Sequence, residues 1–443
     1  MKSNNPRRIA YEMICDVADR GSYIDRIADK YLKGSTGQDR AFILRLVNIT
    51  VERLLELDAV INLYAQTPVK KQKPAVRNVL RLGVCQIAYF DNVPEHAAVS
   101  ESVDLIRSVG KGALSGFVNG VLRALCRDLK ESSYEEVLKK ASGGDLSVIY
   151  SMPRGITDMW LNRFGEEDTK RILKAFFMEK PLTLRVNTLR TDVKKLADKI
   201  KEALSAAGDA EDGPLDIKDN SPRIEVIEEP GIIIIHASIN PGALPGYEEG
   251  EFYVQDRSAM LPVDKAMIQK GDNILDVCAA PGGKSIQAAI LAGEDGHITA
   301  CDLNASRAEI IRENTRRMGI DNIEVCVRDA GEDKPDWHGR YDVVLADLPC
   351  SGLGVLTGKP ESKYRFDRES SEALSRLQHK ILNCVYQYVK PGGRLVFSTC
   401  TINKRENEDN TQSFLESHGD FSLCEEMQLL PDGRGNDGFY YAV

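Results

Sequence analysis

The sequence lacks the features that mark membrane, secreted and zinc-binding proteins. No stretch approaches the roughly 18 to 20 consecutive apolar residues of a membrane-spanning helix, and the polar start, Met1 to Arg8, is not followed by the apolar segment of a secretory signal. The ten cysteines include no Cys-x-x-Cys pair, which argues against a zinc site and a disulfide framework. We therefore expect a cytoplasmic protein with reduced thiols, no bound metal and no membrane association.

An excess of positive charge is also absent. The chain carries a net charge of −9, which by itself argues against a nucleic-acid partner. The charge is unevenly distributed, however: residues 1–130 contain 20 basic and 14 acidic side chains, whereas residues 201–251 contain 3 basic and 12 acidic ones. The acidic average can therefore conceal a basic face on the first part of the chain, where a polyanion would dock.

Three regions of different character divide the 443 residues. Residues 6–130 carry apolar side chains at helical spacing, which predicts an all-α bundle. The polar stretch 134–144 indicates a linker, and the region after it combines a helix at 160–177, strands at 182–187 and 231–235 and an exposed loop at 204–222, as in a small α+β domain. From residue 252 strands alternate with crossover helices, as in α/β domains. We predict domains at 1–135, 145–250 and 251–443.

A basic stripe runs along one predicted helix of the first region. Lys70, Lys71 and Lys73 precede a helix with Pro74 in its first turn, and Arg77 and Arg81 continue the stripe at i, i+4 spacing. Such a stripe can be a solvated helix face or a surface that contacts RNA phosphates, and the sequence leaves both interpretations open.

A Pro-Gly-Gly corner lies at the centre of the α/β region. Strands are predicted at 274–278, 297–302, 323–328, 341–347, 393–399 and 438–443, and helices at 283–292, 304–318, 371–389 and 404–416. The first strand ends at the corner, where open α/β sheets bind ligands and where glycines let the backbone approach them closely. The spacing is not Gly-x-Gly-x-x-Gly, which disfavours a dinucleotide-binding oxidoreductase. The corner comprises Cys278, Ala279, Ala280, Pro281, Gly282, Gly283 and Lys284.

Three acids follow three of the predicted strands. Asp302, Asp329 and Asp347 each come directly after an apolar run. Because the carboxyl ends of parallel strands open onto one crevice, we expect these acids to converge with the glycine corner. Any one of them could be a helix cap, but three in register favour a nucleoside ligand, with Asp302 well placed to accept both ribose hydroxyls.

Two cysteines are predicted in the same crevice. Cys350 follows Asp347 in Asp-Leu-Pro-Cys, and Cys400 follows the next strand in Ser-Thr-Cys. Asn403 and Glu406 have the spacing of a helix cap and its reciprocal partner, so Cys400 is expected near a helix N-terminus, where the dipole favours a thiolate. A buried, unreactive role is the alternative for any cysteine in a strand.

These motifs together resemble the RNA cytosine-5 methyltransferases of the Fmu/Sun type, which use S-adenosylmethionine. The resemblance rests on 276–284, 347–352 and 398–400. The helical region is similar to the NusB-type RNA-binding domain found on the bacterial branch that methylates 16S rRNA, through 77–83, 94–99 and 117–123. The implied fold is multidomain: an all-α NusB-like bundle, a small α+β domain and an α/β Rossmann-like class I methyltransferase domain.

The resemblance also implies a reaction and its residues. Cys400 would add to carbon 6 of a cytosine, Asp347 would hydrogen-bond the base, and Cys350 would assist loss of the carbon-5 proton and release of the enzyme. The corner from Cys278 to Lys284 would hold the methionine part of S-adenosylmethionine, Asp302 its ribose and Asp329 its adenine, with Asp347 beside it. The implied target is cytosine 967 of unassembled or partly assembled 16S rRNA, and the enzyme is expected to be a monomer.

Two departures and two alternatives accompany this prediction. The family more often has Ala or Pro at Leu348, and its loop usually carries Arg-Asn-Pro-Asp where this chain reads Gly358-Lys359-Pro360-Glu361. The substrate contacts of the loop at 354–365 are therefore open. A tRNA or another rRNA cytosine is the alternative substrate, and a non-catalytic RNA-binding assembly factor is the alternative class of function.

Overall fold

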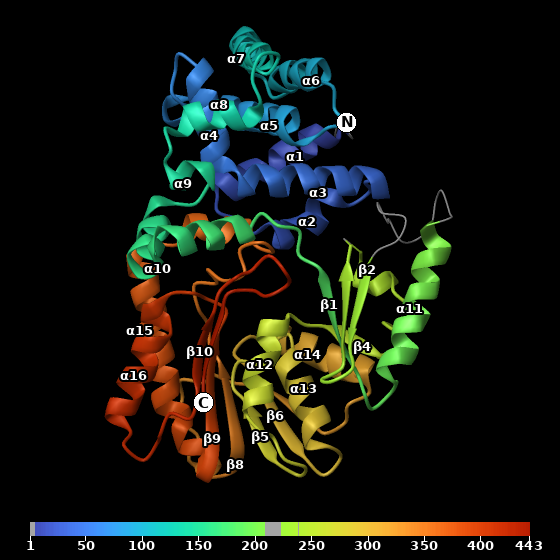
Figure 1. The fold of residues 1–443 in the computed structure, drawn as a ribbon, viewed down its shortest axis with the longest axis vertical. Coiled ribbons are helices and arrows are strands. Elements are labelled where there is room, and N and C mark those ends of the chain that lie inside the picture. Colours follow the sequence, from blue (N-terminus) through green and yellow to red (C-terminus); the bar gives the residue numbers. More distant parts are fainter. Residues whose placement is uncertain (1–4, 209–222, 238) are drawn as a thin grey trace. The chain divides into compact units, whose positions relative to one another are not determined.

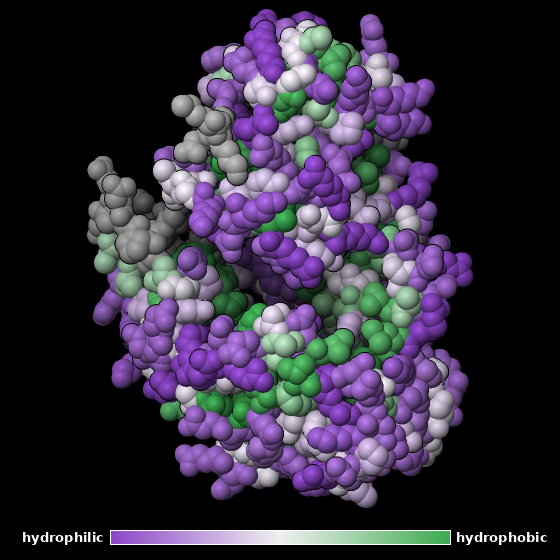
Figure 2. Space-filling model, turned by 180° about the vertical axis from the view of Figure 1, so that it is seen from behind, coloured by the Kyte–Doolittle hydropathy of each residue, from purple (hydrophilic) through white to green (hydrophobic). Residues whose placement is uncertain are grey.

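The structure is a computed structural model that describes residues 5–208, 223–237 and 239–443 (Figure 1). It divides into two compact units. One comprises Met1–Lys174 with the distant segment Leu356–Phe366, and the other comprises Ala175–Val355 with Asp367–Val443. No helix among the described residues is both long and apolar enough to cross a lipid bilayer. On the face drawn in Figure 2, hydrophilic side chains predominate.

The first unit contains the predicted all-helical bundle. Apolar residues three and four positions apart give each helix one face that packs into a common core, formed by side chains such as Ile43, Leu57, Val79 and Leu122. Its elements are α1 (Pro6–Ile14), the π-helix η1 (Cys15–Asp19), α2 (Ile24–Leu32), α3 (Gly37–Glu52), α4 (Leu54–Tyr64), η2 (Val69–Lys71), α5 (Pro74–Tyr89), α6 (Glu95–Ser108), η3 (Gly112–Leu114), α7 (Ser115–Asp128), α8 (Tyr134–Ser142), α9 (Leu146–Ile149), α10 (Arg154–Ala175) and, from the distant segment, η6 (Pro360–Arg365).

The prediction of a linker at 134–144 is wrong. Helix α8 occupies most of it and begins with a capping box, in which Glu136 N donates to Ser133 Oγ (3.2 Å) and Ser133 N donates to Glu136 Oε2 (2.8 Å). Its polar residues form the exposed face of a helix whose Val137 is buried. The predicted helix at 160–177 overlaps α10, whose two helical parts meet at a kink at Gly165 (φ 76°) inside the predicted range.

A four-stranded antiparallel sheet begins the second unit. Its order is β2 (Arg223–Ile227), β3 (Ile232–His236), β1 (Leu182–Val186) and β4 (Phe252–Val254). Helix α11 (Val193–Gly208) covers one face through buried Leu196, Ile200 and Leu204 (Figure 1). The predicted exposed loop at 204–222 is therefore wrong for its first five residues, and positions 209–222 lie outside the described residues.

A seven-stranded, mostly parallel sheet forms the rest of the second unit. Its order is β10 (Glu426–Leu429), β11 (Phe439–Ala442), β9 (Val389–Thr399), β8 (Tyr341–Asp347), β5 (Asn273–Asp276), β6 (His297–Asp302) and β7 (Ile323–Val327). Strands β9, β8, β5, β6 and β7 run parallel, whereas β11 and β10 are antiparallel. The predicted α/β fold is confirmed, although β2, β4, β10 and α12 were not predicted.

Helices cover both faces of this sheet. Alternate strand residues point to opposite faces, so that Ile274, Val343 and Leu345 pack on one side and Leu275, Val344 and Ala346 on the other. The first side is covered by α12 (Arg257–Lys265), α13 (Gly283–Ala292) and α14 (Ala305–Met318). The second is covered by α15 (Arg368–Val385) and α16 (Glu408–Ser417) (Figure 1). The strand ends that carry the predicted site lie between these two layers.

Candidate active site

The glycine corner connects β5 to α13 as predicted. Gly282 has φ 106°, a conformation that L side chains rarely adopt, and a Cβ there would lie 3.3 Å from Ile311 Cγ2. Behind the corner, fully buried Asp276 accepts a hydrogen bond from Ser285 Oγ at 2.6 Å. Burial raises the pKa of Asp276 to about 6. The corner therefore offers bare backbone at the start of α13, with a carboxyl group beneath it.

The acids after β6 and β8 converge on this corner. Burial raises the pKa of the Cys278 thiol, and the carboxylates of Asp276, Asp347 and Asp302 raise it further. All three carboxylates therefore lie close enough to Cys278 to affect its charge. Asp302 is buried and accepts a hydrogen bond from Asn304 N (3.0 Å), while Arg307 lies 3.5 Å away. Carboxyl groups from the ends of three strands therefore lie around the glycine corner.

Asp329 occupies a more exposed position. It lies two residues beyond the end of β7 and accepts a hydrogen bond from Gly331 N at 2.8 Å. Its carboxylate is not among those that raise the pKa of Cys278. Asp329 thus lies on the same edge of the sheet as the other acids, at the end of the outermost parallel strand.

Asp347, at the end of β8, is held by two side chains. Ser398 Oγ donates to Asp347 Oδ1 and Lys284 Nζ donates to Asp347 Oδ2, each at 2.8 Å. Burial alone would lower the pKa of Lys284, but the neighbouring acidic groups, Asp347 foremost and then Asp276, together outweigh burial and raise it, so the ammonium stays charged. Cys400 acts on the same ammonium, which also lies over the Phe439 ring at 5.1 Å. Lys284 therefore points from the glycine corner toward the acid and the second cysteine.

The two cysteines predicted in one crevice face each other. Cys350 Sγ and Cys400 Sγ are 3.4 Å apart, both as free thiols. The hydrogen bond to Cys400, followed by burial, raises the pKa of Cys350 well above its usual range. Cys350 therefore keeps its proton. The pair lies at the ends of neighbouring parallel strands, beside Asp347.

Glu406 connects the two cysteine loops. Its side chain is fully buried and accepts hydrogen bonds from Ser351 N (2.7 Å) and Asn403 Nδ2 (2.6 Å), while Ser351 Oγ and Thr401 Oγ1 are 2.9 Å apart. Asn403 caps only a short 3-10 turn, η8 (Lys404–Glu406). The predicted reciprocal cap at 403–406 and single helix at 404–416 are therefore wrong, because α16 begins at Glu408 and Glu406 is used to fix the loop of Cys350.

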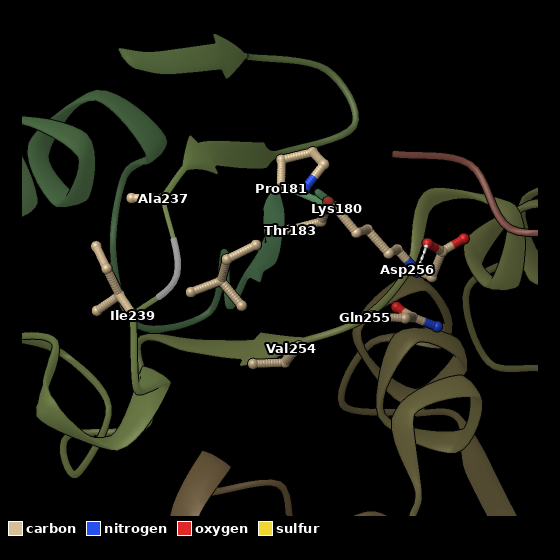
Figure 3. Close-up of a pocket in the computed structure, with 9 residues that line it drawn as sticks. Lys180, Pro181, Thr183, Ala237, Ile239, Val254, Gln255 and Asp256 are labelled. Carbon is tan, nitrogen blue, oxygen red and sulfur yellow. Dashed lines mark ion pairs between the residues drawn. The ribbon is translucent and has the colours of Figure 1, made fainter. Parts of the chain in front are cut away.

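A cavity of about 290 Å³ adjoins the corner (Figure 3). Its wall includes Thr183 and Gln255, and Gln255 Cδ lies 3.8 Å from the position of a Cβ on Gly283. Lys180 reaches across to Asp256 (2.5 Å) and also pairs with Asp437 (2.6 Å). Thr183 Oγ1 and Gln255 Oε1 are buried without a hydrogen-bond partner among the described residues. A polar ligand in this cavity would satisfy them.

Several of these residues were not found by sequence reasoning. Ser398 lies inside the Ser-Thr-Cys motif and could have been assigned from its position two residues before Cys400. Phe439 and Gln255 reach the site from distant segments, and no local pattern marks them. Glu406 was singled out only as a helix-cap partner, and its contact with Ser351 joins segments 55 residues apart.

The predicted basic stripe of the helical unit is only partly exposed. Lys70, Lys71 and Lys73 are exposed, as a phosphate-binding surface requires. Arg81, however, is 8% exposed and forms two hydrogen bonds with Asp58, at 2.7 and 2.6 Å, and Arg77 pairs with Asp19. The assignment of both arginines to an exposed face is wrong, because neighbouring carboxylates bind and neutralise them.

Comparison with known proteins matches the N-terminal and C-terminal regions of the chain to two protein families. The model of the 16S rRNA methyltransferase RsmB/F family matches residues 266–443, and that of the NusB family matches residues 4–127. The probable ribosomal RNA small subunit methyltransferase B of Bacillus subtilis is 30% identical over 99% of this chain and 98% of its own length. Its counterpart in Synechocystis is 32% identical over 97% of this chain and 93% of its own length.

Solved structures show the same fold. The crystal structure of PH0851 superposes with a TM-score of 0.75 at 22% identity, covering 99% of this chain and 98% of that one. NSun6 from Pyrococcus horikoshii, solved with SFG, superposes with a TM-score of 0.54 at 22% identity and covers 66% of this chain and 98% of its own.

Proposed function

The chain belongs to the 16S rRNA methyltransferase family RsmB/F, and from this premise we propose that it methylates carbon 5 of a single cytosine in 16S rRNA, cytosine 967, through a covalent cysteine adduct. The observation that carries the proposal is the pair of thiols, 3.4 Å apart, beside Asp347. A thiol pair next to a carboxylate that is itself held by a lysine provides both a nucleophile and groups that handle protons.

The crevice fits S-adenosylmethionine, which when bound supplies the methyl group. The run from Cys278 to Lys284 offers bare backbone at Gly282 and Gly283, and a side chain on Gly282 would crowd Ile311. The carboxylates around Cys278 suit a sulfonium cation. We assign Asp302 to the ribose hydroxyls and Asp329, at the outer strand, to the adenine, with Asp347 bordering both cofactor and base.

Asp347 is assigned to the target cytosine. A carboxyl group can hydrogen-bond the amino group and ring nitrogen 3 of cytosine and so stabilise the charge that develops as a nucleophile adds to the ring. Ser398 and Lys284 fix its two oxygens, which limits the orientations in which it can meet a base. Because a base within a duplex cannot be attacked, the target must be unpaired or flipped out.

Cys400 is assigned as the nucleophile. Its thiolate sulfur would bond to carbon 6 while the electron pair of the C5–C6 double bond moves to carbon 5, and carbon 5 would take the methyl group as the neutral thioether S-adenosylhomocysteine leaves. A base would then remove the carbon-5 proton, the electron pair of that C–H bond would re-form the C5–C6 double bond, and the Cys400 thiolate would be expelled with release of the product. Cys400 follows β9 directly and is given the attacking role, and Cys350, in the loop after β8, is given the release step. Its position 3.4 Å from Cys400 suits a group that assists release.

The helical unit is assigned to RNA binding. Exposed Lys70, Lys71 and Lys73 supply charge for phosphates, and the unit matches the NusB family. We propose that a monomer acts on naked or partly assembled small-subunit RNA.

The test separates the two cysteines. Cys350→Ala should still form the sulfur–carbon bond and transfer the methyl group but stall, and so accumulate a protein–RNA adduct that survives denaturing electrophoresis and requires S-adenosylmethionine. Cys400→Ser should form no adduct and transfer no methyl group, and neither should the double variant. Cys424→Ala, which removes an exposed thiol, is the matched control and should behave as wild type. Adduct accumulation in a Cys400→Ala variant, with none in Cys350→Ala, would reverse the assignment.

A further inference from the structure

The loop after Cys350 belongs to the helical unit. Its segment Leu356–Phe366 groups with that unit, although it is inserted in the sequence of the other. Glu361 Oε1 accepts a hydrogen bond from Ile24 N (3.0 Å), Lys363 Nζ donates to the carbonyl oxygen of Glu52 (2.6 Å), and Tyr364 OH lies 3.2 Å from Ser151 Oγ. The segment that departs from the family pattern is thus a structural part of the helical bundle.

This segment closes one side of a cavity of about 330 Å³. That volume lies at the lower end of the range for small-ligand sites. One side of the cavity is formed by the π-helix η1 and the turn after it. A π-helix is a rare irregularity that often marks functional sites. Val17, Ala18 and Gly21 form that side, and helices α3, α4 and α5 and the inserted segment complete the wall with residues that include Val51, Leu54, Asp58, Arg77, Glu361 and Tyr364.

Two buried polar atoms in this wall have no hydrogen-bond partner among the described residues. They are Glu361 Oε2, on a side chain 4% exposed, and Arg77 Nε. The Glu361 oxygen can accept a hydrogen bond, and the Arg77 nitrogen can donate one. An unsatisfied buried group of either kind costs free energy, so a ligand that donates to one and accepts from the other would be favoured.

The other charged groups of the wall are already engaged. Arg81 is bound by Asp58, and the Arg365 guanidinium lies over the Tyr23 ring at 3.7 Å. The wall therefore presents one free acceptor and one free donor against apolar side chains such as Val17 and Leu54. A planar ring that carries both a hydrogen-bond donor and an acceptor on its edge has matching chemistry, and every nucleobase is such a ring.

We propose that this cavity holds one unpaired nucleobase of the RNA substrate, read by Glu361 and Arg77. The inference rests on the proposed RNA substrate but on none of the catalytic residues. It gives the inserted segment a role in substrate binding within the helical unit, separate from the cytosine that reacts.

The test compares pentanucleotides that contain no cytosine, so that the catalytic pocket is not engaged. Oligo-A and oligo-U would be titrated by fluorescence anisotropy into the full chain with S-adenosylhomocysteine present. Glu361→Gln keeps an oxygen for Ile24 N but turns the free acceptor into a donor, and Arg77→Lys keeps a charge for Asp19 but removes Nε. Each variant should bind both oligomers about five-fold or more weakly than wild type.

The control strand is an abasic pentamer with the same phosphates. On it, wild type and Glu361→Gln should bind equally, because Glu361 is proposed to touch a base and not a phosphate. Glu131→Gln, an exposed change in the same unit, should match wild type throughout. Unchanged binding of oligo-A and oligo-U by Glu361→Gln, or an equal weakening on the abasic strand, would overturn the proposal and leave a cavity filled by water only. Because no methyl transfer is measured, a failure of the proposed reaction would be seen separately.

Discussion

Lys284 lies where the glycine corner meets Asp347, the acid that is proposed to bind the cytosine. The sequence places it in the Pro-Gly-Gly-Lys run and so predicts a cofactor contact. In the structure its ammonium is bound to Asp347 at 2.8 Å, an interaction between residues 63 positions apart that no spacing rule could reveal. The convergence of Cys350, Cys400 and Asp347, in contrast, could be predicted, because each lies at or just after the end of a predictable strand of one parallel sheet.

Replacing Lys284 tests how much Asp347 depends on it. In Lys284→Gln the Asp347 carboxylate loses its charged partner and one of the two side chains that fix its oxygens, so kcat should fall more than the KM for S-adenosylmethionine rises. We expect a loss of kcat/KM on the order of 10²-fold, comparable to the removal of one donor from a preorganised site.

The control is Lys270→Gln, an exposed change in the same unit, which should leave kcat and KM unchanged. A Lys284→Gln enzyme with the wild-type kcat and only a raised KM for S-adenosylmethionine would show that Lys284 serves the cofactor alone.

At the scale of elements, predictability depended on the strength of the local pattern. Strand β8 contains the apolar run Val343–Ala346 and was predicted to the residue, as expected for a strand buried on both faces. Strand β10 contains Glu426 and Gln428 at the edge of the sheet, and α12 carries Pro262 in its interior, so neither shows a clear period. Their positions are determined by pairing with β11 and by packing on α13, which are tertiary effects.

The buried carboxyl group of β5 should make folding depend on pH. Burial raises the pKa of Asp276 to about 6 in the folded state, above its value in an unfolded chain. The folded state therefore holds its proton more tightly, and stability is lost as pH rises from about 4 to 6, by up to about 3 kcal/mol.

Asp276→Asn removes this titration while keeping an oxygen for Ser285. In urea unfolding between pH 4 and pH 7, the stability of wild type relative to Asp276→Asn should fall with rising pH and level off above about pH 6. A difference that stays constant across this range would show that the pKa of Asp276 is not raised by burial.

At the scale of the whole molecule, an acidic protein binds a polyanion through a local concentration of positive charge. The sequence located that charge in the first 130 residues but could not show that Arg77 and Arg81 turn inward to Asp19 and Asp58. The i, i+4 spacing of the two arginines shows that they share one face of a helix. Whether that face is buried depends on which other helices pack against it, and the spacing does not show this.

The three exposed lysines of this unit are therefore expected to carry the phosphate contacts. Changing Lys70, Lys71 and Lys73 to Gln should make the plot of log affinity against log salt less steep by roughly 0.7 to 0.9 for each phosphate that is no longer neutralised. The same change at Lys130, Lys139 and Lys140, also exposed, is the control. An equal reduction from both triple variants would mean that the effect reflects overall charge and not a binding surface.

The most direct test of the proposed function is bisulfite sequencing of total RNA from cells with and without this gene, with the Cys400→Ser gene as a third strain. Cytosine methylated at carbon 5 resists conversion, so one position of 16S rRNA, cytosine 967, should be protected only in cells that carry the intact gene. Loss of protection in the Cys400→Ser strain would connect that mark to the proposed nucleophile. Protection of a tRNA cytosine instead, or an unchanged RNA pattern in all three strains, would contradict the proposed function.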